Sequence, residues 1–203
     1  MLMVEMSYFW RLLYVGSSEP GRYIDLMDKL PLQVCEWTCI FASFMLMKKS
    51  HNLYQVCFFI SMTLGIFPLL TPSVITTTGP TYYRYYQYWL EHCLPILAVY
   101  YMTFVHNARP KLKGVGFAAA FMSVLVTFAL ICNFNIPEAN YLYLSPIGTS
   151  DGGGSVMDIM IKIAPNIWVR LVLLAIVVVA LFFLVYFISR GITKLYQKRT
   201  KAS

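Results

Sequence analysis

Five apolar segments follow one another along the chain, at about 31–48, 53–75, 88–106, 114–136 and 166–189. A helix needs about 20 apolar residues to cross the hydrocarbon core of a bilayer. The clearest segment is "IWVRLVLLAIVVVALFFLVYFISR", whereas the first, "LPLQVCEWTCIFASFMLM", is interrupted by Gln33 and Glu36. Since lipid cannot satisfy open backbone groups, this pattern predicts an all-α, polytopic membrane protein with about five transmembrane helices.

The flanking sequences complete the predicted organisation. Residues 1–30 are expected to form an N-terminal interfacial segment, with a helix over 1–16 lying at headgroup depth. Residues 31–190 would form one helical membrane domain, and 191–203 a basic tail. In the second apolar segment, "TLGIFPLLTP" contains two prolines and a glycine, which predicts a kink or break in that helix. Farther along, "SDGGGS" predicts a flexible turn and "VMDIMIKIA" a short surface helix.

The distribution of basic residues predicts the topology. Of the 16 lysines and arginines, ten follow the first, third or fifth apolar segment, so all ten share one side if the segments alternate. The positive-inside rule assigns that side to the cytoplasm, with the N-terminus outside and the C-terminus inside the cell. The net charge of +7 is then a consequence of topology in the cell membrane, and no nucleic-acid partner is expected.

Several polar side chains should collect at one depth near the outer leaflet. The first and third segments enter from that side and the fourth leaves there, so a rise of about 1.5 Å per residue matches their depths. Polar groups at membrane depth are costly and usually mark a functional cavity. The residues concerned are Gln33, Cys35, Glu36, Arg84, Gln87, Glu91, His92, Asn133, Asn135, Asn140 and Tyr141.

Among these residues, Cys35 and His92 are the candidate catalytic pair. An imidazole that takes the proton of a thiol creates a thiolate nucleophile, and lipid ester bonds lie at this depth. The guanidinium of Arg84 suits a phospholipid phosphate. The other substrate-binding candidates are Gln87, Asn140 and Tyr141, as oxyanion or headgroup donors, together with Gln33 and Glu36.

Simpler interpretations exist for each of these residues. A cysteine in an apolar helix is usually a small buried hydrophobe, which is what we expect of Cys39, Cys57, Cys93 and Cys132. His92 could tie two helices together, and the tyrosines of 82–88 fit an aromatic belt. Five cysteines exclude complete disulfide pairing. No metal-ligand pattern and no cofactor motif is evident, so neither a metal nor a cofactor is expected.

Four pieces, "LPLQVC", "GIFPLLTP", "RYYQYWLEH" and "NYLYL", occur in the order seen in a known family. Over about residues 30–190 the chain resembles the integral membrane proteins typified by bacterial YwaF and eukaryotic transmembrane protein 164. The resemblance implies an acyltransferase that acts on ether-type lysophospholipids through a cysteine of the first motif and a histidine of the third. These positions are Cys35 and His92, and transfer would pass through an acyl-cysteine. Gln33 stands where bacterial relatives usually have histidine, "APNIWV" replaces "WPWY", and relatives commonly have another N-terminal helix.

Three functional hypotheses follow. The first is a membrane acyltransferase that moves a fatty-acyl chain from a phospholipid to a lyso-lipid or lipoprotein acceptor, with direct transfer by His92 as base left open. The second is a small-molecule transporter or its substrate-binding subunit, which should tolerate Cys35→Ser. The third is a scaffold in which His92 and Arg84 only join helices. The oligomeric state does not follow from the sequence.

Overall fold

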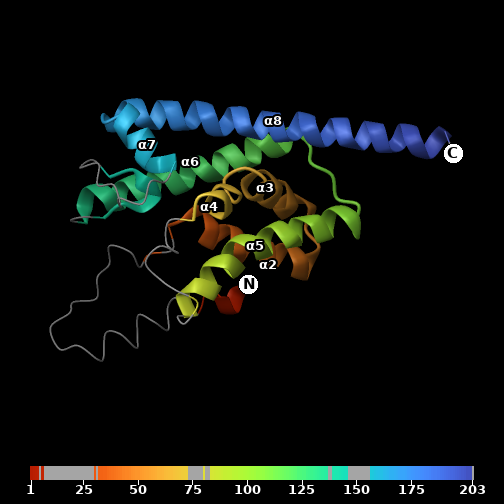
Figure 1. Ribbon diagram of the computed structural model, residues 1–203, viewed down its shortest axis with the longest axis horizontal. Helices are drawn as coiled ribbons and strands as arrows, with labels where there is room; N and C mark the ends of the chain where they lie inside the picture. The colour runs from red at the N-terminus through yellow and green to blue at the C-terminus, as the bar shows by residue number, and fades with distance from the viewer. Residues whose placement is uncertain are drawn as a thin grey trace.

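The computed structural model describes residues 1–4, 6, 30, 32–72, 80, 83–136, 139–145 and 156–202. Within these ranges all regular structure is helical, which confirms the predicted all-α class (Figure 1). The predicted 1–16 helix and the "SDGGGS" turn lie almost entirely outside them. The elements are α2 (Val34–Lys48), α3 (His51–Ser61), α4 (Phe67–Leu70), α5 (Tyr83–Phe104), α6 (Leu112–Asn135), the 3₁₀ turn η3 (Tyr141–Tyr143), α7 (Val156–Ile163) and α8 (Ile167–Ala202).

Helix α3 lies at the centre of the bundle and contacts α2, α5, α6 and α8. Its buried side chains include Tyr54, Cys57, Phe59 and Ile60, which pack with apolar residues of the surrounding helices. Helix α8 lies alongside α6 and extends beyond the rest of the bundle at its C-terminal end (Figure 1). The core is therefore organised around the short helix α3. Its central position could not be predicted from its own sequence.

Two of the described helices are long and apolar enough to cross a membrane, α6 and residues Ile167–Lys194 of α8. Large apolar side chains along α8 are exposed, including Val172, Ile176, Phe183 and Phe187, as expected of a surface that contacts lipid. These helices indicate a membrane protein. The predicted count of five spans is not confirmed, because α2 has 15 residues and α3 only 11, fewer than the roughly 20 of a full span.

The second predicted segment, 53–75, is not one helix. Helix α3 ends at Ser61, a turn follows, and α4 occupies only Phe67–Leu70. In the turn, a Cβ on Gly65 would lie 2.9 Å from the backbone oxygen of Ser61, so the close chain reversal requires glycine. The predicted break is confirmed at this glycine, and the remaining helix is shorter than predicted.

The other boundaries also differ from the predicted segments. Helix α5 begins at Tyr83 rather than 88, so most of the tyrosine run is helical. Helix α8 continues to Ala202, so the predicted basic tail is largely helix, because lysine, arginine, glutamine and leucine all favour helix. The short helix predicted in "VMDIMIKIA" is confirmed as α7.

A close contact between α3 and α6 fixes the loop that joins α5 to α6. Gln55 Nε2 donates to the Arg109 carbonyl at 3.0 Å, and Lys111 N–H donates to Gln55 Oε1 at 2.7 Å. Gly114 lets α6 approach, since a Cβ there would lie 2.8 Å from Phe59 Cε2 and closer still to Gln55 Oε1. A buried amide and a glycine therefore set the α3–α6 distance.

We expect Gly114→Ala to lower the free energy of unfolding by about 1–3 kcal/mol, because the added methyl overlaps Gln55 and Phe59. Unfolding in mixed detergent micelles measures the change. Gly116→Ala is the matched control, since nothing lies within 4 Å of a Cβ at that position, and alanine there should be neutral or stabilising. Equal stability of the two variants would contradict the close contact.

Candidate active site

The candidate site lies where α2 packs against α5. The two helices run in the same direction (Figure 1), and the thiol of Cys39 donates to the Glu91 carbonyl at 3.2 Å. Moving one turn toward both N-termini places Cys35 at about the level of Gln87. Helices α2 and α5 therefore pack together at this end of the bundle, with Cys35 and Gln87 at about the same level.

The cysteines of α2 differ in accessibility. Cys39 is 0% exposed and Cys57 of α3 is 1% exposed, as expected of small buried side chains, whereas Cys93 and Cys132 are only half-buried. Cys35 is only half-buried, and it lies on the same side of α2 as Cys39, one turn closer to the helix start. Partial exposure is typical of reactive cysteines, so Cys35 is the thiol of α2 that a substrate could reach.

His92 is buried at 6% exposure, and a backbone contact orients its ring. Nδ1 lies 2.7 Å from the Tyr88 carbonyl oxygen. A carbonyl can only accept a hydrogen bond, so Nδ1 carries a proton, and in the neutral imidazole Nε2 then carries the lone pair. The bond also draws the ring back toward the N-terminus of α5, to within about one helical turn of the level of Cys35.

Tyr88 supports His92, a role that sequence reasoning missed. Its ring centroid lies 4.5 Å from that of His92, and its hydroxyl donates to the Pro68 carbonyl of α4 at 2.6 Å. Tyr88 is buried, so the aromatic-belt interpretation is wrong for this residue, although it fits the exposed Tyr86. The signal in the sequence was the i, i+4 spacing of Tyr88 and His92.

Three predicted substrate-binding residues also have structural roles. Gln33 is the N-cap residue of α2, and Glu36 Oε2 accepts from its N–H at 2.9 Å, as in a capping box. Gln87 is buried and donates to the Val4 carbonyl at 3.1 Å, which ties the N-terminal residues to α5. All three lie near the start of α2 or α5, at about the same level along the bundle as Cys35.

Asn140 and Tyr141 belong to a separate part of this end of the bundle, the η3 loop (residues 139–145). Tyr141 N–H donates to Asn133 Oδ1 at 2.8 Å, and Asn133 Nδ2 donates to the Tyr141 carbonyl at 2.9 Å. The Tyr141 hydroxyl accepts from Leu30 N–H at 3.1 Å, and Asn140 Oδ1 accepts from Ser145 N–H at 3.1 Å. These bonds hold the loop between α6 and the chain that leads into α2, so Asn140 and Tyr141 have a positioning role.

Two arginines bear on the site, the predicted phosphate ligand Arg84 and the buried Arg170. The backbone of Arg84 lies in the first turn of α5, and its side chain is outside the described part of the structure. Arg170 of α8, which sequence reasoning passed over, is 0% exposed. Its Nη2 donates to the Ser145 carbonyl at 2.7 Å. The signal available was an arginine inside an otherwise apolar span.

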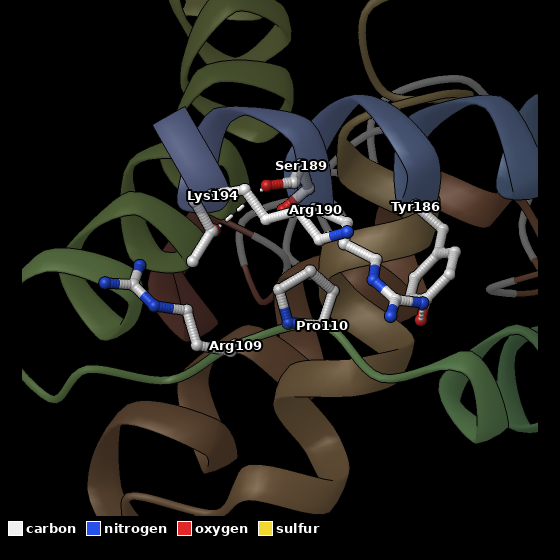
Figure 2. A pocket seen from close by; sticks show the side chains of 7 residues that line it. Arg109, Pro110, Tyr186, Ser189, Arg190 and Lys194 are labelled. Atoms are coloured by element: carbon white, nitrogen blue, oxygen red, sulfur yellow. Dashed lines mark hydrogen bonds between the residues drawn. The ribbon is translucent and has the colours of Figure 1, made fainter. Parts of the chain in front are cut away.

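A basic groove of about 290 Å³ lies at the other end of α8 (Figure 2). Arg109 and Pro110 of the α5–α6 loop face Tyr186, Ser189, Arg190, Thr193 and Lys194 of α8. His92 lies in the first half of α5, whereas Arg109 follows the C-terminal end of that helix. The groove is therefore remote from Cys35 and His92. Its three cations are among the residues that define the predicted cytoplasmic side.

Among the residues that the structure describes, no three histidine, cysteine or acidic side chains are grouped so that they could hold a metal ion. The candidate site therefore consists of a thiol, an imidazole and polar side chains, in the part of the chain that is described.

A family model described as "TMEM164 family" matches residues 1–186, and the chain therefore belongs to that family. This confirms the resemblance inferred from the four ordered motifs. No curated protein and no solved structure matches the chain.

We expect Asn133→Leu to lower the free energy of unfolding by about 2–4 kcal/mol, because both hydrogen bonds to the Tyr141 backbone are lost in a buried place. Asn135→Leu is the matched control on the same helix. Asn135 is exposed and bonds only to the Ile131 carbonyl of its own helix, so its change should stay within about 0.5 kcal/mol. Equal effects of the two substitutions would show that the Asn133–Tyr141 pair does not hold the η3 loop.

Proposed function

We propose that the protein is a membrane acyltransferase that transfers a fatty-acyl chain from a phospholipid to a lyso-lipid or lipoprotein acceptor. Cys35 is the nucleophile and His92 the general base. The observation that carries the proposal is the Nδ1 contact of His92 with the Tyr88 carbonyl. It fixes the tautomer whose Nε2 can take a proton, on the helix that packs against the one bearing Cys35.

In the first half-reaction, His92 Nε2 takes the proton of the Cys35 thiol, and the thiolate attacks the ester carbonyl carbon of the phospholipid. The ester C–O bond breaks, and the departing lyso-lipid oxygen takes the proton back from His92. In the second half-reaction, His92 deprotonates the acceptor hydroxyl or amine, which attacks the thioester. The C–S bond breaks, and the thiol is restored with the proton that His92 holds.

The surrounding residues have supporting roles in this proposal. The Gln87 amide, at about the level of Cys35, would donate to the developing oxyanion. Arg84 would approach the lipid phosphate from the first turn of α5. Gln33 and Glu36 fix the start of α2, and so the position of Cys35. Membership in the TMEM164 family supports the proposal without identifying the acceptor.

The proposed topology has five passes, with the N-terminus outside and the C-terminus in the cytoplasm. The passes are α2, α3 with α4, α5, α6 and α8. The lengths of α2 and α3 require the adjoining turns to complete their passes. The basic residues after α2, α5 and the apolar part of α8 support this orientation, which puts the start of α2 in the outer leaflet.

Intact mass spectrometry of purified protein incubated with phospholipid tests the reaction. Wild type should carry a hydroxylamine-labile fatty-acyl adduct and release lyso-lipid, and Cys35→Ala should do neither. His92→Ala should lower lyso-lipid release by about 10²–10⁴-fold, because the general base is lost.

Cys39→Ala is the matched control, one turn deeper on the same helix, and should keep at least most of the wild-type rate. Lyso-lipid is scored in every sample, since fast turnover would hide the adduct. Lyso-lipid release by Cys35→Ala at the wild-type rate would exclude the thioester route. No lyso-lipid in any sample would exclude phospholipid as the donor.

A further inference from the structure

Arg170 is buried with most of its hydrogen-bonding capacity unused. It lies near the start of α8 and is 0% exposed. Nη2 donates to the Ser145 carbonyl at 2.7 Å, whereas Nε and Nη1 have no partner among the residues that the structure describes. Three of the five N–H bonds of a guanidinium are on Nε and Nη1, so the interaction with Ser145 leaves the larger part of the group without an acceptor.

A buried cation with idle donors is costly. Each unsatisfied buried donor loses its hydration without compensation, and an unneutralised charge adds several kcal/mol. The buried carboxylates of the described residues, Glu36 and Glu91, belong to α2 and α5, and neither forms an ion pair with Arg170 in that part of the chain. The described part of the fold thus supplies no acceptor for Nε and Nη1 of Arg170, which leaves these donors available to a group from outside the protein.

A second idle donor lies against the apolar cluster that adjoins Ser145. Ser145 follows Leu144, which belongs to a buried cluster with Leu125, Tyr141 and Leu142. Trp37 of α2 packs against the same cluster, and its buried Nε1 has no hydrogen-bond partner among the described residues. Two N–H donors around one cluster favour a ligand that is rich in acceptors.

The position of Arg170 along α8 identifies the class of ligand. The apolar span of α8 begins at Ile167, so Arg170 lies about one turn inside one end of it. The acceptor-rich anion at that depth of a bilayer is the phosphate of a phospholipid, and guanidinium is the side chain best suited to it. An acidic peptide would have to leave water to reach this depth.

We propose that Arg170 donates hydrogen bonds to the phosphate of a bound membrane phospholipid. The inference rests on the proposed function in taking this lipid to be the acyl donor. The η3 loop connects the two sites, because Ser145 and Tyr141 lie on one loop and the Tyr141 hydroxyl accepts from Leu30, just before α2. A phosphate at Arg170 would then hold the donor beside the start of the helix that bears Cys35.

The test is thermal unfolding of the full-length Cys35→Ala protein in detergent, since this background requires no turnover. The probes are dioleoylphosphatidylglycerol, dioleoylglycerol (which lacks phosphate) and inorganic phosphate. At saturation the phospholipid should raise Tm by roughly 5 °C, and the other two probes should leave it unchanged. Arg170→Met should remove the rise.

Arg190→Met is the matched control, because Arg190 is an exposed arginine in the C-terminal part of α8, and among the described residues its side chain hydrogen-bonds to the Tyr186 hydroxyl at 3.4 Å. It should keep the rise. Without lipid, Arg170→Met should be no less stable than its parent, since it removes an uncompensated charge. A purely structural arginine would instead make this variant less stable and leave the lipid response intact.

Three results would overturn the inference: an equal rise with dioleoylglycerol, an equal rise with inorganic phosphate alone, or an undiminished phospholipid response in Arg170→Met. If Arg170→Met does not fold, Arg170→Lys and the wild-type comparison of phospholipid with dioleoylglycerol decide the question.

Lipid binding at Arg170 without acyl transfer by wild type would reject the proposed function alone. Acyl transfer with a lipid response that ignores Arg170 would reject this inference alone.

Discussion

Lipid offers no hydrogen bonds, and this constraint governs the polar groups of the bundle. A polar side chain that faces away from water must find its partner inside the protein. Gln55 bonds to Arg109 and Lys111 of the α5–α6 connection, Asn133 to both backbone groups of Tyr141, and Tyr88 to the Pro68 carbonyl of α4. Each of these contacts joins a helix to another segment of the chain. The polar residues therefore determine how the apolar helices are arranged.

The same constraint connects structure to chemistry at His92. Its Nδ1 bond to a backbone carbonyl satisfies a buried donor, and it also determines which ring nitrogen can act as a base. Arg170 departs from this pattern, as do Trp37 Nε1 and Ser61 Oγ among the described residues, because two of its three nitrogens have no acceptor in the fold. A buried donor that the fold leaves unsatisfied is one that a ligand can satisfy.

Sequence patterns predicted the helical class and the break at Gly65, because length, hydropathy and glycine placement are local properties. They also predicted that Cys35, Gln87 and His92 lie toward the same end of the bundle, because successive segments alternate in direction. They could not predict that α3 is central or that Tyr88 orients His92, because such roles depend on contacts between helices. The spacing of Gln33 and Glu36 is that of a capping box, which a local sequence pattern can predict. Their polarity alone favoured substrate binding instead. Arg170 was hidden inside the most apolar segment of the chain.

Helix α8 continues beyond the end of its apolar span. It has 36 residues in all, and its span ends at Lys194, so about two turns continue into the basic segment without a break. A continuous helix transmits rotation and tilt along its whole length. Its last residues would thus act as a rigid stem, and in the proposed topology a displacement of the end near Arg170 would be carried through the bilayer to the opposite surface.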